Sequence, residues 1–298
     1  MQPDQLTRLY VPLSSHGLHF DGEYMEIAPC PALAPYVRCF WGSLHARTAR
    51  GGSRVIPDSC MDLIFEVNYT QNCVTGRFCA LDDAAYVTPD YVSQDLVASF
   101  GVRFYAWTAA CFAEADFRDA LGKVFDPEAH FSALFRALAP QLFEPDDLIA
   151  RAASAERELL RRLRPDRPGN DLLNAIYGMI SGCGREKVGE IAARAGMSGR
   201  QLERKLLRCT GAGPKLLMQL MRCQMVYREV LEGRYRALDA VERYGYADQS
   251  HLLREFRRFQ GVLPGELIEK RTKMIRCVGF LLYTKGTLDI QSVQEGCI

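Results

Sequence analysis

Charged side chains that could contact a nucleic acid are concentrated in residues 188–208, which read VGEIAARAGMSGRQLERKLLR. The apolar spacing predicts a short helix, a tight turn at Gly196 and a second helix that begins after Ser198. Serine is a good N-cap, and glycine permits the sharp turn of a helix-turn-helix. If the leucines of the second helix face inward, its outward residues are mostly charged: Arg200, Glu203, Arg204 and Arg208.

The same arrangement returns in residues 237–259, ALDAVERYGYADQSHLLREFRRF. Leu238 and Val241 would face inward from the first helix of this unit. Gly245 would form the turn, and Asp248 would cap the second helix. The N-terminal turns of such a helix are the part that meets base edges in a major groove. Here these turns carry Gln249, Ser250, His251 and Arg254.

One helix is expected to join the two units. The intervening segment, PKLLMQLMRCQMVYREVL, predicts a helix from Pro214 to Leu231, because proline is favourable at the first helical position. At 1.5 Å per residue such a helix is roughly 27 Å long. A rod of that length would present both outward helices to neighbouring major grooves, which are about 34 Å apart.

With these motifs, residues 171–271 resemble the AraC/XylS family of bacterial transcription regulators. The resemblance rests on IAARAGMSGRQLERKL, GAGPKLLMQLMRCQMV and YGYADQSHLLREFRRFQGVLPGEL. It implies a seven-helix domain with two helix-turn-helix units that binds double-stranded DNA, and a transcription regulator that works with RNA polymerase as an activator or a repressor. Two positions depart from the family pattern: Glu242 replaces a small residue and Leu267 an aromatic one.

We expect base edges to be read by Arg200, Glu203 and Arg204 in the first unit, and by the four residues from Gln249 to Arg254 named above in the second. Arginine suits the O6/N7 pair of guanine and glutamine the N6/N7 pair of adenine, and each good contact contributes about 1–3 kcal/mol of discrimination. An alternative is that an arginine pairs with a carboxylate on its own helix, as Arg204 with Glu203 or Arg254 with Glu255.

Phosphates would be held by the amides at the start of each reading helix, near Ser198 and Asp248, together with Lys205, Arg208 and Arg257. Charge favours this part of the chain as the polyanion-binding part. Residues 170–271 contain 18 Lys and Arg against 12 Asp and Glu, about +6, although the whole chain has a net charge of +1. The remainder is therefore acidic.

The N-terminal half contains β-branched and aromatic runs of strand length, namely RVIPDSCMDLIFEVN, VTGRFCAL, AYVTPDY and LVASFGVRFYAW. Residues 36–44 predict a further strand, and a turn at Asp21-Gly22 would join shorter strands before it. Short strands at this spacing predict a small barrel or a bent sheet with an internal pocket. The expected fold class is α+β: a β-rich, barrel-like N-terminal domain with helices, then an all-α domain of two helix-turn-helix units.

Helical spacing predicts two helices before the linker, over residues 109–130 and 146–163. The second has an apolar stripe opposite Arg151, Glu158, Arg161 and Arg162. The stripe would pack on the sheet or form the seam of a homodimer, and it consists of Ile149, Ala152, Leu159, Leu160 and Leu163.

The proline-rich and glycine-containing segment RPDRPGN is the clearest linker. The expected division is therefore a sensing or dimerisation domain over 1–164, a linker over 165–170, a DNA-binding domain over 171–271 and an apolar tail over 272–298. Because this tail is rich in apolar residues, it is expected to pack on one of the domains or on a partner.

The motifs APYVRCFW, PDSCMDLIF and FGVRFYAW resemble the β-rich N-terminal domain of one branch of the same family. The pattern departs at Ser59, where the family has glycine, and at Ala106-Trp107, where it has Pro-Gly. We expect a small-molecule effector to bind in this domain, with Trp41, Phe65, Phe104 and Trp107 as candidate pocket residues. The alternative is that these four side chains are ordinary aromatic core.

No catalytic, metal or cofactor site is expected. The five histidines and 11 cysteines follow no metal-ligand spacing, and no nucleotide-binding or nucleophile-elbow motif occurs. Asp58 and Asp62 lie four residues apart, but such carboxylates more often accept from backbone amides or an arginine. No window is long and apolar enough to span a membrane and no signal peptide is recognisable, so we expect a cytoplasmic, nucleoid-associated protein without a membrane partner.

The sequence therefore predicts a sequence-specific DNA-binding transcription regulator controlled by a small molecule. Three other modes stay open. A cysteine-based redox response would use some of the 11 cysteines. A ligand-independent regulator would be governed by its expression or by a partner protein, and an enzymatic N-terminal domain would turn over a small molecule.

Overall fold

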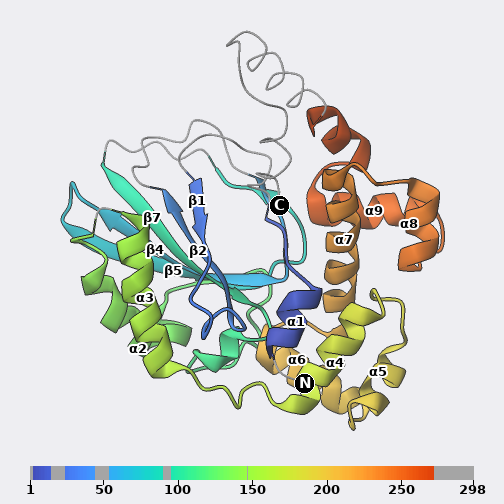
Figure 1. The fold of residues 1–298 in the computed structure, drawn as a ribbon, viewed down its shortest axis with the longest axis horizontal. Coiled ribbons are helices and arrows are strands. Elements are labelled where there is room, and N and C mark those ends of the chain that lie inside the picture. The colour runs from blue at the N-terminus through green and yellow to red at the C-terminus, as the bar shows by residue number, and fades with distance from the viewer. Residues whose placement is uncertain (1–2, 15–23, 44–53, 90–94, 146, 272–298) are drawn as a thin grey trace.

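The fold is mixed, with a sheet-rich N-terminal half followed by a helical C-terminal half (Figure 1), and this confirms the predicted fold class. The computed structural model describes residues 3–14, 24–43, 54–89, 95–145 and 147–271. The predicted turn at Asp21-Gly22 and the predicted packing of the 272–298 tail lie outside the described residues.

A six-stranded antiparallel sheet forms the N-terminal half. Its strands, in spatial order, are β1 (Tyr24–Ile27), β2 (Val37–Ser43), β7 (Val97–Tyr105), β4 (Cys60–Asn68), β5 (Cys73–Cys79) and β8 (Val124–Phe125). A separate pair is formed by β3 (Arg54–Val55) and β6 (Tyr86–Val87). The strand predicted over 36–44 is confirmed as β2. Because β1 and β8 lie at opposite edges, the described strands form an open sheet and not a closed barrel.

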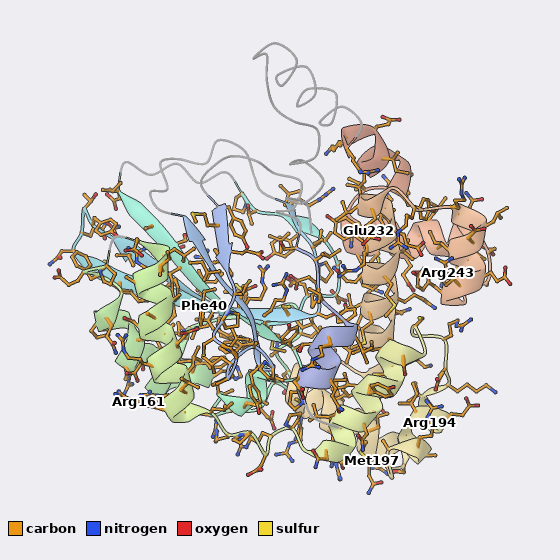
Figure 2. The ribbon with its side chains drawn as sticks, viewed as in Figure 1. Phe40, Arg161, Arg194, Met197, Glu232 and Arg243 are labelled. Atoms are coloured by element: carbon orange, nitrogen blue, oxygen red, sulfur yellow. The ribbon has the colours of Figure 1, made fainter. Side chains whose placement is uncertain are left out.

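The core of this half lies on one face of the sheet. Successive strand residues point to opposite faces, so Phe65 on β4 and its register partner Phe100 on β7 share a face with Phe40 on β2. The rings of Phe40 and Phe100 stack at 6.0 Å, and Phe40 is labelled in Figure 2. Helices α2 (Glu128–Leu138) and α3 (Leu148–Arg162) cover this face, with the 3-10 turn η3 (Ala139–Gln141) between them.

The helix predicted over residues 109–130 is wrong. The segment contains the 3-10 turn η2 (Ala109–Cys111), an irregular stretch and strand β8 before α2 begins. Phe112 and Phe117 are buried, but they enter the core from loop backbone. Gly122 has a φ of 67°, in the left-handed region, so the chain turns there instead of continuing a helix.

The second predicted N-terminal helix is confirmed as α3, with Asp147 as its N-cap. Ala152 and Leu159 of the predicted apolar stripe are buried, but four other residues are oriented differently from the prediction. Arg151 and Glu158 are buried, whereas Ile149 is 71% and Leu160 44% exposed. The Arg151 guanidinium donates to the backbone carbonyls of Leu142 and Pro145, which provides the hydrogen bonds that a buried charge requires. The inward face of α3 therefore combines apolar residues such as Ala155 and Leu159 with polar side chains whose hydrogen bonds are made inside the protein.

The C-terminal half consists of helices packed around one long rod. The rod is α7 (Pro214–Glu232). Its length of 19 residues agrees closely with that of the predicted joining helix. The other helices are α4 (Asn170–Ser181), α5 (Val188–Arg194), α6 (Gly199–Thr210), α8 (Ala237–Tyr244), α9 (Gln249–Gln260) and a last one that begins at Pro264 and is described as far as Arg271. Leu238 on α8, predicted to face inward, is 75% exposed. None of the helices in the described ranges has the length and apolarity to cross a membrane.

The N-terminal helix α1 (Pro3–Leu9) packs against α4, in the other half of the chain (Figure 1). The segment after it runs between the two halves. Leu13 exchanges two backbone hydrogen bonds with the side chain of Gln224 on α7, and Gln224 also donates to the carbonyl of Pro57. Residues from the start of the chain therefore connect the sheet to the rod.

Candidate nucleic-acid interface

The first helix-turn-helix unit, α5 and α6, has the predicted local chemistry. Gly196 turns the chain with a φ of 72°. The Ser198 hydroxyl accepts from the amide of Gln201 at 3.2 Å, and the Gln201 side chain accepts from the amide of Ser198 at 2.8 Å. This reciprocal capping box stabilises the start of α6. Leu202 and Leu206 are fully buried, which orients the opposite face of α6 outward.

The second unit, α8 and α9, repeats this design with different residues. Asp248 caps α9 by accepting from the amide of His251 at 2.7 Å. His251 returns the bond through its ring, because its Nδ1 accepts from the amide of Ala247 at 3.4 Å. The ring also packs edge-on against Tyr246. His251, predicted to read a base, is thus engaged inside its own unit.

The predicted base-reading residues other than His251 are exposed on the outward faces of the two helices: Arg200, Glu203, Arg204, Gln249, Ser250 and Arg254. Across the described ranges, the side chains of Arg204 and Arg254 have neither an ion pair nor a hydrogen bond. Glu255 cannot neutralise Arg254, because it is buried and bonded to Arg222. Both arginines are therefore available to an external partner.

Two of the predicted phosphate-binding residues have partners inside the protein. Lys205 pairs with Asp171 at the start of α4; burial acts to raise the pKa of this carboxyl, but the hydrogen bond from Lys205 holds it below its usual range. Arg208 donates to Asp116 of the N-terminal half at 3.2 Å. Arg257 is exposed.

A buried ion pair, which sequence reasoning missed, anchors the second reading helix to the rod. Arg222 on α7 donates from Nε to Glu255 on α9 at 2.9 Å, and its guanidinium lies 4.1 Å from the ring centroid of Tyr246. The Tyr246 hydroxyl donates to the same carboxylate at 2.8 Å. Burial opposes the charge of Arg222, but its bonds to Glu255 raise its pKa. The glutamate of the R-E-F-R-R motif, which is Glu255, was the sequence signal that could have indicated this ion pair.

The four aromatic residues predicted to line a pocket do not surround one space. Phe65 stacks on Phe135 at 5.3 Å and Phe104 on Phe131 at 5.6 Å, both under α2. Trp41 lies on the opposite face of the sheet, because its register partner Gly101 is an odd number of residues from Phe104 along β7. Trp107 follows the end of β7 and packs on Tyr105 at 5.3 Å. Strand alternation separates side chains that looked equivalent in the sequence.

The face of the sheet that carries Trp41 holds a charged cluster. Asp62 accepts from the Trp41 indole at 2.7 Å and from Arg103 Nε at 3.0 Å, and Asp58 lies 3.6 Å from the same guanidinium. Burial raises the pKa of Asp58 to about 6, which Asp62 reinforces and Arg103 opposes. The two carboxylates thus satisfy an arginine and, through Asp58, the amide of Cys60.

Most of the described cysteines have the properties of unreactive thiols. The nine within the described ranges are free, and Cys39, Cys60, Cys111, Cys209 and Cys223 are buried. Burial raises the pKa of Cys39, Cys79 and Cys111 to about 12. Because the thiolate is the nucleophile, raised pKa values lower reactivity at neutral pH. No group of three or more metal-ligating residues occurs among the described residues.

Two capped helix-turn-helix units on one long helix, each with an exposed basic face, define a double helix-turn-helix protein. Comparison with known families agrees: residues 191–270 match a family described as "Helix-turn-helix domain", and residues 25–126, which span β1 to β8, match a "Domain of unknown function (DUF6597)". The C-terminal part of the chain is thus a helix-turn-helix domain of the AraC type, which supports a role in DNA-binding transcription regulation.

Among solved structures, the chain is similar to ToxT from Vibrio cholerae. One such structure, at 1.65 Å resolution, has 9% sequence identity and a TM-score of 0.39 over 83% of this chain and 98% of that one. An apo structure of a ToxT variant has 10% identity and a TM-score of 0.38 over 78% and 97%. A third contains an unsaturated fatty acid, with 9% identity and a TM-score of 0.35 over 83% and 93%. No curated protein sequence matches the chain.

Proposed function

We propose that the protein reads base edges with the outward faces of α6 and α9 together. The observation that supports this is the equivalence of Arg204 and Arg254, which occupy the same place in the two reading helices and are both exposed without a partner within the described ranges. An unpaired guanidinium presents parallel donors that match O6 and N7 of guanine. Arg200, Glu203, Gln249 and Ser250 complete the proposed base-reading set.

The remaining predicted contacts take different roles in this proposal. His251 supports the start of α9, because its ring already caps that helix. Arg257 and the amides at the two helix starts hold phosphates. Lys205 and Arg208 reach a phosphate only if their pairs with Asp171 and Asp116 open. Binding to chromosomal DNA would also place the protein at the nucleoid.

The test is selection of bound duplexes from a random pool with the full-length protein, followed by the same selection with Arg204→Ala and Arg254→Ala. Each variant should relax preference at one position and lose about 1–3 kcal/mol on the preferred site. Arg157→Ala, which removes a comparable charge from α3, is the matched control and should keep the wild-type preference. Uniform weakening across all sequences would assign the arginine to a phosphate, and equal binding of every duplex would refute sequence-specific reading.

Small-molecule control is supported by a cavity of about 310 Å³ between the two halves of the chain. One wall is the N-terminal segment with Tyr10 and Val11; the other comes from α7 and α8 and includes Arg228 and Arg243. A ligand in this cavity would touch both halves, so its affinity would differ between arrangements of the two, which is the requirement for control. The lining contains three arginines, Arg228, Arg234 and Arg243, against one carboxylate, Glu229, which pairs with Arg243; the excess of positive charge favours a small anion.

Thermal unfolding with citrate or inorganic phosphate tests this part. A ligand present at a free concentration of 100 times its Kd stabilises the protein by about 2.7 kcal/mol, which raises the melting temperature. Arg243→Ala should abolish this rise. An equal shift in the variant would place the ligand elsewhere. Chloride at matched ionic strength is the control.

Redox control is the weaker alternative, since five of the nine described cysteines are buried and burial raises the pKa of thiols such as Cys39. Alkylation of the native protein, mapped by peptide mass, would support it only if a described cysteine reacted before unfolding. We also expect the regulator to contact RNA polymerase and to assemble into a homodimer. The exposed Ile149 and Leu160 of α3 are the residues to test in a homodimer.

A further inference from the structure

The N-terminal half contacts both reading helices at the same residue. α6 and α9 each contain twelve residues, and their positions correspond at an offset of 50. Arg208 and Arg258 are the tenth residues of these helices. Each is bonded, through both backbone and side chain, to a segment of the N-terminal half.

At the first helix, the amide of Phe117 donates to the carbonyl of Arg208 at 2.9 Å, and the Arg208 side chain pairs with Asp116. The backbones are in close contact here. A Cβ added at Gly211, just after the helix, would lie 2.8 Å from the carbonyl oxygen of Phe117. Only glycine fits this approach.

At the second helix, the amide of Ala85 donates to the carbonyl of Arg258 at 2.9 Å. The Arg258 side chain donates from Nε to the carbonyl and from Nη2 to the carboxylate of Asp83, both at 2.9 Å. Gly261 holds the place of Gly211, and a Cβ there would lie 3.4 Å from Ala85. The two contacts therefore use equivalent atoms.

Both contacts come from one connected piece of the N-terminal half, residues 80–85 and 113–123, which we call the docking edge. The amide of Ala80 donates to the carbonyl of Lys123 at 3.1 Å, and the amide of Gly122 to the carbonyl of Leu81 at 2.8 Å. Strand β5, which precedes the first segment, pairs in the sheet with β8, which follows the second. The docking edge therefore holds its two aspartates in a fixed relation.

The reading helices are consequently joined twice: through the rod α7, and through the docking edge at their C-terminal ends. The contacts leave the N-terminal turns of both helices open, with Arg200, Arg204 and Arg254 exposed. The contacts hold the C-terminal ends of the two helices and leave their base-reading faces free. They are therefore better suited to aligning the helices on DNA than to blocking DNA binding.

We propose that Asp83 and Asp116 are positioning residues through which the N-terminal half sets the separation of the two base-reading helices, and so makes the regulator strict about the spacing between its two half-sites. The inference rests on the proposed reading of DNA by both helices. Each base pair inserted between half-sites rotates one of them by about 34° around the duplex, because a turn holds about 10.5 base pairs. A rigid pair of helices cannot follow that rotation.

The experiment measures binding of the full-length protein to duplexes that carry the selected half-sites with one or two base pairs inserted or deleted between them. The wild type should bind each altered duplex at least about tenfold more weakly than the optimum, because one helix loses its base contacts. Asp83→Lys/Asp116→Lys places like charges beside both arginines and should bind the same duplexes within about threefold of its own optimum. Its affinity for a single half-site should equal that of the wild type.

Glu128→Lys/Glu144→Lys is the matched control, because it makes the same change in net charge at exposed positions outside the docking edge. It should keep the wild-type spacing profile. Should the lysine variant not fold, Asp83→Asn/Asp116→Asn removes the pairs without repulsion and carries the same test.

A wild-type spacing profile in the docking-edge variants would overturn the inference. Tighter binding by these variants at the optimal spacing would also overturn it, since the contacts would then obstruct DNA binding. Failure of the wild type to prefer any duplex would instead overturn the proposed function. A single half-site bound with wild-type affinity separates these results from general damage to the DNA-binding surface.

Discussion

Arg222 and Glu255, 33 residues apart in the chain, form a buried bidentate ion pair between the rod and the second reading helix. The pair fixes α9 on α7 by charge and geometry together, and Tyr246 completes the bonding of the carboxylate. Within the described ranges no equivalent pair joins α6 to the rod, and apolar contacts of Leu202 and Leu206 hold the first unit. The second unit is also joined to the rod through Glu229 on α7, which accepts from the Tyr244 hydroxyl of α8 at 2.9 Å, so polar bonds hold both of its helices.

Arg222→Ala should destabilise the protein by about 3–5 kcal/mol in urea unfolding, because Glu255 would remain buried without its partner. Arg200→Ala, at an exposed position, is the control and should change stability by less than about 0.5 kcal/mol. Arg222→Met/Glu255→Leu should recover most of the loss, since apolar residues of similar volume need no charge partner. A loss below about 1 kcal/mol in Arg222→Ala would contradict the assigned role.

Ser59→Gly should destabilise the protein even though it restores the family's residue. Ser59 has a φ of 64°, a left-handed conformation that costs a non-glycine residue about 1 kcal/mol, but glycine loses a similar amount through its freer unfolded chain. What decides the sign is the bond between the Ser59 and Tyr10 hydroxyls at 3.1 Å, both buried. Leaving the Tyr10 hydroxyl unpaired costs about 1–3 kcal/mol.

A double-mutant cycle with Tyr10→Phe checks this account by thermal or urea unfolding. In the Tyr10→Phe background the Ser59 hydroxyl has already lost its bond to Tyr10, so Ser59→Gly should no longer destabilise the protein. A gain in stability from Ser59→Gly alone would show that backbone strain outweighs the hydrogen bond.

Gly101→Ala should destabilise the sheet by about 2–4 kcal/mol, because a Cβ at this position would lie 2.1 Å from the indole of Trp41. The indole would have to leave the surface of β7 and with it the bond to Asp62. Gly189→Ala in α5 is the matched control: a Cβ there meets nothing within 4 Å, and alanine favours a helix by up to about 1 kcal/mol. Equal melting shifts in the two variants would rule out the proposed overlap.

The pH dependence of stability should carry the signature of Asp58. Burial raises its folded pKa from 3.8 to about 6, so the folded state binds the proton more tightly than the unfolded state. Its stabilising contribution is present below about pH 4 and is lost as pH rises through 6. Asp82 acts in the same direction, because burial and the neighbouring Asp58 raise its pKa to about 6.

Asp58→Asn should therefore match the wild type near pH 4 and exceed its stability by roughly 1–3 kcal/mol above pH 6. Urea unfolding at several pH values measures the difference. Asp119→Asn, which removes a carboxylate from an exposed site, is the control. A constant difference between Asp58→Asn and wild type across the range would mean that the carboxyl titrates normally.

The sequence by itself determined the two helix-turn-helix units and the rod between them, because caps, turns and helical spacing act between residues close in the chain. Ser198 and Asp248 could be recognised as caps for that reason, and α7 by its apolar spacing after Pro214. The exposed arginines of the reading helices followed from the same periodicity.

Only the tertiary structure decided the rest. It placed Trp41 and Phe65 on opposite faces of the sheet, buried Arg151 in place of Ile149, and joined Asp83 and Asp116 to equivalent residues of the two reading helices. These relationships join residues dozens to hundreds of positions apart, and an arginine or an aspartate looks the same in a sequence whether its partner is solvent or a buried carbonyl. The choice depends on which surfaces meet when the two halves pack, because a buried charge must find its hydrogen bonds there.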